Sequence, residues 1–336
     1  DYLTLMEFDG AADGGFPYSG SLVLDGTTLY GMTFGTGPTS FGTIFKTDSS
    51  GNNLQVLSTF SPNMPGENPI YAQLCEATNG KLYGMTRVGG SNGAGVIFEY
   101  NIFSNSYTKK SEFGGANGEN PSGSLMKASN GKLYGITYSG GANKCGVIFE
   151  YDYSANLYIK KIDLDSVNGK TPYGSLMEAG NGKLYGMTSY GGTNNSGVIF
   201  EYNYTTNTYT KKIDLSSASG KNPDGTLMLA SNGKLYGVTV SGGANDVGVL
   251  FEYDKGTNVY TKKIDLGSIS GSHPHGSLMQ APKGKLYGTT YRGGANGAGV
   301  IFEYDYYTRS YTTVSYTHLR AHETKANLVC RLLLEK

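Results

Sequence analysis

The sequence contains no tryptophan, and only 16% of its 336 residues are charged. Lys and Arg together number 27, as do Asp and Glu, so the formal net charge is zero. Binding to a phosphate backbone needs an excess of positive charge, which argues against a nucleic-acid partner. The sequence also lacks a run of about 18 consecutive apolar residues, the length that a transmembrane helix needs, so we expect no membrane span.

Cysteine is scarce as well. The three cysteines are Cys75, Cys145 and Cys330, which lie far apart and have neither CxxC spacing nor the density of a disulfide framework. We therefore predict no metal site and no cofactor.

Glycine and tyrosine are abundant, with 51 and 28 residues respectively. Together with few charges, this composition is typical of many short strands joined by tight turns. An all-β fold is the expectation, and 38% hydrophobic residues are enough to bury a substantial core.

Two markers recur in phase along the chain, which is the signature of a tandem repeat. The tyrosine of a Leu-Tyr-Gly tripeptide falls at Tyr30, Tyr83, Tyr134, Tyr185, Tyr236 and Tyr287. A phenylalanine of a mostly apolar run falls at Phe45, Phe98, Phe149, Phe200, Phe251 and Phe302. Both series have a first interval of 53 residues and then intervals of 51, so the chain holds six copies of one unit.

One copy, residues 175–215, predicts four short strands at 175–179, 183–188, 198–202 and 209–215. Gly180-Asn181-Gly182 between the first two suits a tight hairpin. The third strand is apolar almost throughout, which indicates that both of its faces are covered. Blades packed face to face about an axis meet that need. We predict an all-β β-propeller of four-stranded antiparallel blades, six in number, or seven or eight if the sequence is truncated.

A family resemblance follows from the motifs Lys-Leu-Tyr-Gly-x-Thr, Gly-Gly-x-Asn and Gly-Val-Ile-Phe-Glu-Tyr, found at residues 183–202 and 285–304. They resemble the bacterial GloVer-type tandem β-repeat family and, more distantly, kelch repeats. The resemblance implies a propeller-like protein that is extracellular or on the cell surface, with a targeting signal outside this sequence. The family has no established activity to carry over.

The repeats cover residues 1–313, and the last residues, 314–336, share nothing with them. This tail resembles a translated adapter sequence that recurs at the ends of reading frames assembled from metagenomes. We treat it as a non-native segment and expect no metal site at its His318, His322 and Glu323.

Positions that differ among the copies are free to respond to a ligand, and they concentrate on loops. One set follows the proline that precedes the first strand of each copy and is expected to ring the central opening: Tyr18, Ile70, Ser122, Tyr173, Asp224 and His275. The other lies at the end of the second strand, where tyrosines suit sugar faces and arginines suit carboxylates: Arg87, Tyr138, Tyr190, Tyr291 and Arg292. The alternative is that exposed loop residues vary freely and that tyrosines fill gaps between blades.

Charged residues that recur in every copy predict structure rather than chemistry. The glutamate of the third strand, as at Glu201, and the lysine pair of the fourth, as at Lys211 and Lys212, are expected to form a solvated charge ladder. Only His273 and His275, with Asp224 as a partner from the neighbouring copy, suggest acid–base chemistry. We assign no catalytic residue.

These observations favour a secreted or cell-surface binding module, monomeric, whose loop-bearing face contacts a glycan or a protein. Two alternatives stay open. One is a carbohydrate-active enzyme with its site in the central opening, near Asp224 and His275. The other is a structural or adhesin repeat with no specific ligand.

Overall fold

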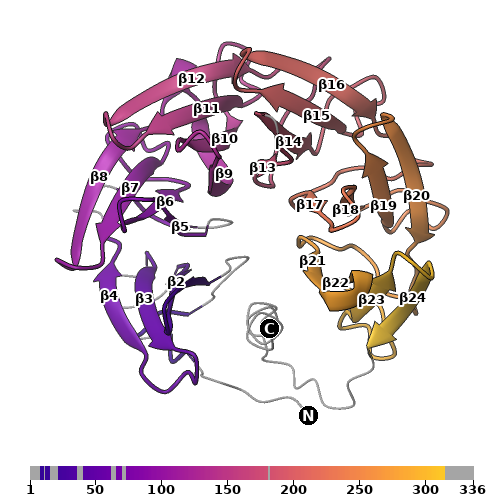
Figure 1. Cartoon of the computed structure of the whole chain (residues 1–336), viewed down its shortest axis with the longest axis horizontal. Helices are drawn as coiled ribbons and strands as arrows, with labels where there is room; N and C mark the ends of the chain where they lie inside the picture. Colours follow the sequence, from indigo (N-terminus) through magenta and orange to yellow (C-terminus); the bar gives the residue numbers. More distant parts are fainter. Residues whose placement is uncertain are drawn as a thin grey trace. The chain divides into compact units, whose positions relative to one another are not determined.

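Strands and turns make up nearly all of the protein. The structure is a computed structural model that describes residues 8–10, 12–15, 22–35, 41–61, 66–69, 73–180 and 182–314. These residues form six four-stranded antiparallel sheets, each from one continuous stretch of chain with its strands in sequence order (Figure 1). Two three-residue 3₁₀ helices, η1 (Gly115–Asn117) and η2 (Pro282–Gly284), are the helices among them. The predicted all-β architecture with six propeller-type blades is confirmed.

The described residues fall into two compact units. The first comprises residues up to 142 together with 147–161, and the second comprises 143–146 together with 162–314. The first three sheets belong to the first unit, apart from the last two residues of β12. Their strands are β1 (Val23–Asp25), β2 (Thr28–Thr33), β3 (Thr43–Asp48), β4 (Gln55–Thr59), β5 (Cys75–Glu76), β6 (Leu82–Thr86), β7 (Val96–Asn101), β8 (Ser106–Glu112), β9 (Glu119–Lys127), β10 (Leu133–Ser139), β11 (Val147–Asp152) and β12 (Leu157–Asp163).

The second unit holds the other three sheets. Their strands are β13 (Met177–Glu178), β14 (Lys183–Thr188), β15 (Val198–Asn203), β16 (Thr208–Asp214), β17 (Met228–Leu229), β18 (Leu235–Thr239), β19 (Val249–Asp254), β20 (Val259–Asp265), β21 (Met279–Ala281), β22 (Lys285–Thr289), β23 (Ile301–Asp305) and β24 (Ser310–Val314). Residues 315–336, which include His318, His322, Glu323 and Cys330, lie outside the described part of the chain.

Strand boundaries in the copy at 175–215 agree closely with the prediction, except in its first strand. The strand β13 has two residues, whereas five were expected. The backbone N–H of Ser175 donates to Thr226 Oγ1 of the following copy, at 2.8 Å, instead of joining a ladder with β14. A contact between sheets therefore replaces part of the pairing within the sheet.

The two sequence markers of the repeat form one contact. Gly186 of β14 lies opposite Phe200 of β15, and the Phe200 ring covers the glycine so closely that an added Cβ would be 2.4 Å from Cζ. The same glycine–phenylalanine contact recurs in all six sheets. The repeat thus preserves glycine here because a ring occupies the space of a side chain.

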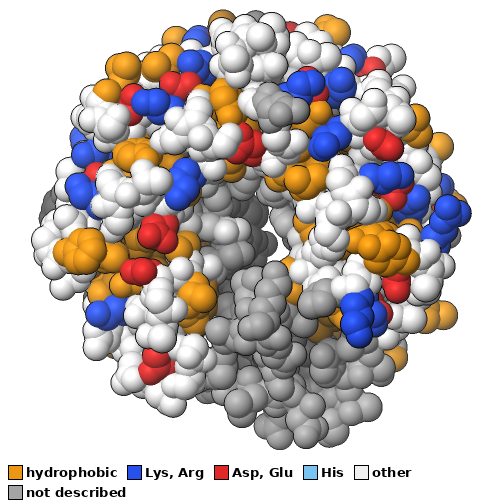
Figure 2. Space-filling view, in the orientation of Figure 1, with side chains coloured by type: hydrophobic (Ala, Val, Ile, Leu, Met, Phe, Trp, Pro, Cys, Tyr) orange, Lys and Arg blue, Asp and Glu red, His pale blue; other side chains and the backbone are white. Residues whose placement is uncertain are grey.

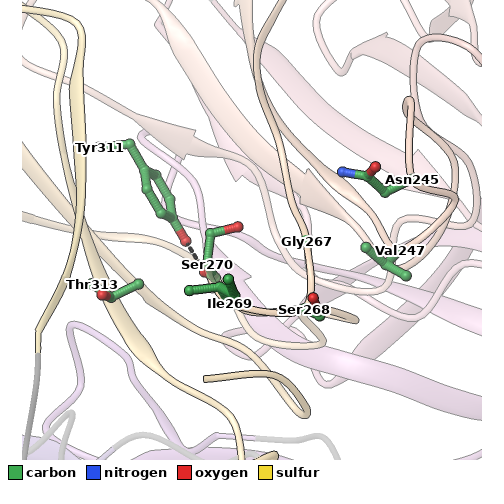
Figure 3. Close-up of a pocket in the computed structure, with 8 residues that line it drawn as sticks. All are labelled: Asn245, Val247, Gly267, Ser268, Ile269, Ser270, Tyr311 and Thr313. Carbon is green, nitrogen blue, oxygen red and sulfur yellow. Dashed lines mark hydrogen bonds between the residues drawn. The ribbon is translucent and has the colours of Figure 1, made fainter. Parts of the chain in front are cut away.

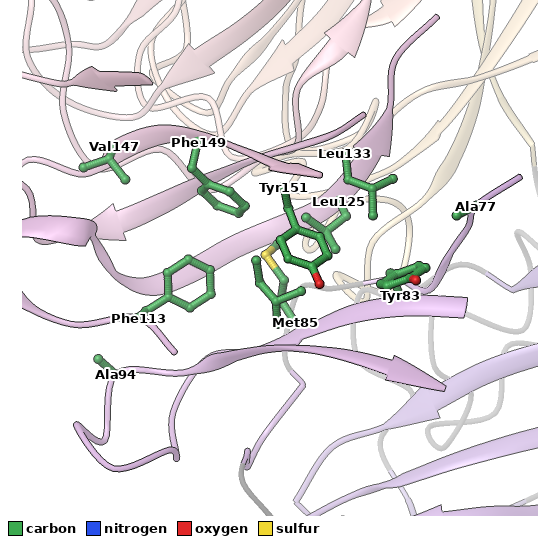
Figure 4. Close-up of a cluster of buried hydrophobic side chains, with 11 residues drawn as sticks. Ala77, Tyr83, Met85, Ala94, Phe113, Leu125, Leu133, Val147, Phe149 and Tyr151 are labelled. Carbon is green, nitrogen blue, oxygen red and sulfur yellow. The ribbon is translucent and has the colours of Figure 1, made fainter. Parts of the chain in front are cut away.

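The core lies between neighbouring sheets of each unit. In the first unit, Tyr83 and Met85 of β6 pack with Leu133, Phe149 and Tyr151 of the next sheet (Figure 4). All five are buried, and burying a side chain of this size contributes about 1.5–3 kcal/mol. The second unit repeats this packing in a cluster built around Tyr185, Phe251 and Tyr253. Both faces of the second and third strands are covered there, as the apolar pattern indicated.

The predicted solvated charge ladder is wrong for the glutamates. Glu252 of β19 is buried, accepts a hydrogen bond from the Tyr236 hydroxyl, and is paired with Lys234 at 3.0 Å and Lys263 at 3.2 Å. Its strand is covered on both faces, so the carboxylate is tolerated only with partners. Burial acts to raise the pKa of Glu252, but the bonds from Tyr236 and the two lysines outweigh it and hold that pKa below its ordinary value.

The tyrosine–glutamate bond recurs in four of the other sheets, whereas the first sheet has Lys46 at this position. The glutamates that accept from the tyrosine of Leu-Tyr-Gly are Glu99, Glu150, Glu201, Glu252 and Glu303. The first lysine of each fourth-strand pair has a different partner, as Lys211 pairs with Asp214 at 2.9 Å. The first lysine of a pair therefore contacts a partly exposed aspartate or glutamate of its own strand, and the second contacts the glutamate of the third strand, as Lys212 contacts Glu201.

Candidate functional site

Two kinds of loop leave each sheet from the same strand ends: the loop from the second to the third strand, and the loop that leads from the fourth strand to the next sheet. In the second unit, backbone bridges join them, pairing Lys170 with Tyr190 and Ser272 with Arg292. These bridges hold the two sets of predicted ligand-binding residues together.

Three successive loops of the second unit pass directly against one another. A Cβ added at Gly174 would lie 2.3 Å from the Gly225 carbonyl oxygen, and one at Gly225 would lie 2.6 Å from that of Gly276. Only glycine allows this approach. As a result, the residues just before these glycines come from neighbouring sheets and yet lie near one another.

Asp224 and His275 meet in this region. His275 Nδ1 lies 2.9 Å from Asp224 Oδ2, although the residues are 51 positions apart. The other carboxylate oxygen, Oδ1, accepts a hydrogen bond from Ser189 Oγ at 3.0 Å, and that hydroxyl also lies 2.6 Å from the Pro223 carbonyl oxygen. The His275 side chain is 46% exposed, and its Nε2 has no hydrogen-bond partner among the described residues. Asp224 thus holds His275 with Nε2 available to a ligand.

Tyr291 and Arg292 extend this group. The Tyr291 ring is 54% exposed and stands edge-on to the His275 ring, with centroids 5.8 Å apart. The Arg292 guanidinium lies over the Tyr291 ring, 5.6 Å from its centroid. We name the set Ser189, Asp224, His275, Tyr291 and Arg292 the loop cluster.

The backbone of His273 joins the loop of the cluster to a neighbouring loop. Its backbone N–H donates to the Val247 carbonyl at 2.8 Å, and its own carbonyl accepts from the Tyr291 N–H at 3.1 Å. Its Nδ1 is buried without a hydrogen-bond partner. Burial, together with the charges of Arg292 and His275, lowers the pKa of His273 and favours its neutral form.

The other predicted residues are distributed differently. Tyr18 and Ile70 lie outside the described residues. Ser122 is 1% exposed because β9 is nine residues long and pairs Ser122 with Ile136, which leaves it no open surface. Tyr173 is partly buried in the second unit, beside Gly174, and Tyr190 is 41% exposed. The expected ring of six residues stays a prediction. Among the described residues, Asp224 and His275 are the two members that are seen in contact.

In the first unit, Arg87 and Tyr138 form a pair of their own. The Arg87 guanidinium lies 5.3 Å from the centroid of the Tyr138 ring, and both side chains are partly buried. This contact joins the ends of the second strands of two neighbouring sheets. It is a cation–π contact like that of Arg292 with Tyr291, but it joins residues of two sheets and not adjacent residues.

Ser189 is the residue of the cluster that the sequence interpretation missed. In strict phase with the repeat, it occupies the position of Arg87, Tyr138 and Tyr291, whereas the prediction named Tyr190, one residue later. A strict alignment of the copies gives the signal, because this position holds five different residue types in the six copies.

A shallow open groove of about 660 Å³ lies elsewhere in the second unit (Figure 3). It is lined by Asn245, Val247, Gly267, Ser268, Ile269, Ser270, Tyr311 and Thr313. Its polar groups serve the fold, since Tyr311 donates to the Ser270 carbonyl at 2.6 Å and Asn245 to the Leu266 carbonyl at 2.7 Å. None of the predicted site residues lines it, so the loop cluster is the better candidate site.

The described surface in Figure 2 shows no extended patch of one charge that would indicate a large binding surface. Basic and acidic side chains are interspersed on the described part of the face in Figure 2, in keeping with the zero net charge. Among the described residues, no group of three or more His, Cys, Asp or Glu side chains is placed to bind a metal ion. Over the same residues, no helix has the length and apolar character needed to cross a membrane. Recognition at the loop cluster would depend on local groups.

Comparison with known families agrees with the repeat motifs. The family described as the Gloeobacter/Verrucomicrobia repeat matches residues 1–179 and 158–331. The chain belongs to this family. Among curated protein sequences, none matches the chain.

Solved structures show the same class of fold as this repeat protein. The extracellular domain of a putative hybrid two component system from B. thetaiotaomicron has a TM-score of 0.62 at 13% identity, over 94% of this chain and 36% of that one. A putative 6-phosphogluconolactonase from Bacteroides fragilis has a TM-score of 0.59 at 18% identity, over 88% and 83% of the two chains. TolB from Acinetobacter baumannii has 0.51 at 14%, over 87% and 64%. The chain therefore spans little more than a third of the first of these proteins, and all three likenesses concern the fold alone.

Proposed function

We propose that this repeat protein is an extracellular or cell-surface binding module that holds a glycan at its loop cluster. The observation that carries the proposal is the contact of His275 with Asp224 beside the exposed Tyr291 ring. The extracellular setting is supported by the resemblance of the repeats to their family and by the extracellular domain that has a similar fold.

A glycan suits this chemistry because a sugar ring has an apolar face and a hydroxylated edge. The Tyr291 ring offers a surface for the apolar face. Asp224 and His275 are already oriented by their mutual hydrogen bond, so polar contacts to sugar hydroxyls would cost little side-chain entropy. The strands on either side hold the loops rigidly, as a binding site requires.

A glycan array with matched tyrosine variants tests the proposal. Tyr291→Ala should weaken binding about fivefold, which corresponds to about 1 kcal/mol for one aromatic contact. Tyr307→Ala is the control, because Tyr307 is 70% exposed in the turn between β23 and β24, at the opposite strand ends of the same sheet. Equal binding by both variants and the wild type, or a partner that proves to be a protein, would contradict the proposal.

An enzyme is the second candidate, and the Asp224–His275 hydrogen bond favours it. A carboxylate that fixes Nδ1 of a histidine leaves Nε2 ready to accept a proton. However, Ser189 donates to Asp224 and not to His275, so it is not placed as an activated nucleophile. Cleavage of the probe glycans that His275→Gln abolishes would establish the enzyme. Intact glycans after long incubation would leave binding as the function.

A further inference from the structure

The loop cluster has a charge pattern that narrows the class of glycan. We propose that it recognises the carboxylate of an acidic sugar, such as a uronic acid residue, through Arg292 and His275, with the sugar ring against Tyr291. This inference rests on the proposed function and specifies its ligand.

The charges around His275 leave one cation without a partner. Asp224 is engaged with His275, and Asp246, the next carboxylate, is paired with Lys221 at 2.8 Å. The ion pairs of the described residues leave Arg292 without a carboxylate. Arg292 therefore supplies a positive charge that matches one carboxylate of a ligand.

The geometry allows Arg292 and His275 to reach the same ligand. Arg292 and His275 each lie within 6 Å of the centroid of the Tyr291 ring. A sugar in contact with that ring is therefore near both. The planar guanidinium of Arg292 presents two N–H groups that match the two oxygens of a carboxylate, a fit that a neutral sugar does not use.

The matched probes are tetragalacturonic acid and its methyl ester, which keep the same sugars and differ in charge. We expect calorimetry on the full chain at about pH 5.5 to show the acid binding about fivefold to tenfold tighter than the ester, since one exposed ion pair contributes about 1 kcal/mol. Arg292→Ala should reduce this preference, measured as the ratio of the acid and ester affinities of the same variant. Lys255→Ala, which removes a positive charge from the turn between β19 and β20 at the opposite strand ends, should leave this ratio unchanged.

His275 supplies a second readout. Its ring lies edge-on to Tyr291 and is held by Asp224, so a carboxylate that Arg292 binds beside Tyr291 is also near His275. We expect His275→Gln to show a smaller preference for the acid over the ester than the wild type in the same calorimetry.

The outcomes separate this inference from the proposed function. Equal binding of acid and ester, both weakened by Tyr291→Ala, would overturn carboxylate recognition and leave glycan binding in place. A sulfated galactan oligosaccharide, whose negative charge comes from sulfate esters and not from carboxylates, is a further probe. If it binds as tightly as the acid, carboxylate recognition is overturned, because the cluster would then respond to negative charge in general. Binding of none of the three probes would overturn this inference alone, if the array identifies another glycan that depends on Tyr291.

Discussion

Replacing Gly186 with alanine tests the contact on which every sheet of this protein depends. The added Cβ would lie 2.4 Å from Phe200 Cζ and 2.9 Å from Cε1, whereas carbon atoms in contact prefer about 3.5–4.0 Å. Gly186 does not have a left-handed φ, so its backbone by itself would accept alanine. The expected destabilisation therefore comes from the collision with the ring.

The Phe200 ring has little room to move. It is fully buried and stacks on Tyr209, with centroids 5.0 Å apart and an interplanar angle of 28°. Overpacking of this kind costs about 1–3 kcal/mol, and the loss of chain entropy in the unfolded state returns about 0.4–1 kcal/mol. We expect Gly186→Ala to lower the free energy of unfolding by about 1–2 kcal/mol, or the Tm by about 1.5–3 °C.

Differential scanning calorimetry on four variants provides the measurement: Gly186→Ala, Gly256→Ala, Phe200→Leu and the double variant Gly186→Ala/Phe200→Leu. Gly256→Ala is the control, because its Cβ would meet only the flexible Asp254 carboxylate, at 3.3 Å, and its effect should be within about 0.5 kcal/mol of zero. Adding Phe200→Leu to Gly186→Ala should cost less than the sum of the two single changes, by about 0.5 kcal/mol or more. A Gly186→Ala protein that unfolds at the wild-type temperature would refute the reasoning.

Three further outcomes are expected. Tyr236→Phe removes the hydroxyl that donates to buried Glu252 and should cost about 1.5–3 kcal/mol in urea unfolding, against about 1 kcal/mol for Tyr253→Phe, whose hydroxyl donates to a neutral amide. Because the folded protein lowers the pKa of Glu252, this group stabilises the fold above its ordinary pKa of 4.5, and the stabilisation is lost as the pH falls through the folded-state pKa. Acid unfolding followed by circular dichroism should show this loss of stability, and the loss should be smaller in Tyr236→Phe. Ser189→Ala leaves Asp224 Oδ1 without its hydroxyl donor, so stability should fall by about 1 kcal/mol in the same urea assay and binding of the acidic probe should weaken in calorimetry.

Much of the fold could be predicted because its signals are local. The strand β14 was expected at 183–188 and forms at Lys183–Thr188, since the glycine-rich turn and the β-branched and aromatic residues that specify it lie within a few positions. The buried glutamates were not foreseen. A carboxylate is normally placed on the surface, and only the tyrosine and lysine partners from neighbouring strands make its burial acceptable.

The candidate site was predicted in part for the same reason. Comparison of the copies identified Asp224, His275, Tyr291 and Arg292 as variable positions, because differences between repeats are visible in the chain itself. It passed over Ser189, whose importance lies in a bond to a residue of the next sheet.

Taken alone, the sequence was enough to establish six repeats, four strands in each and the turns between them, because periodicity and turn chemistry act over a few residues. The tertiary structure decided how closely the variable residues meet and brought Ser189 to them. His275 reaches Asp224 across 51 positions because glycines at 174, 225 and 276 let three loops pass within contact of one another's backbones. The repeat period pointed to Asp224 as the neighbour of His275, but the 2.9 Å contact and the bond from Ser189 depend on how neighbouring sheets pack, which the order of the residues does not specify.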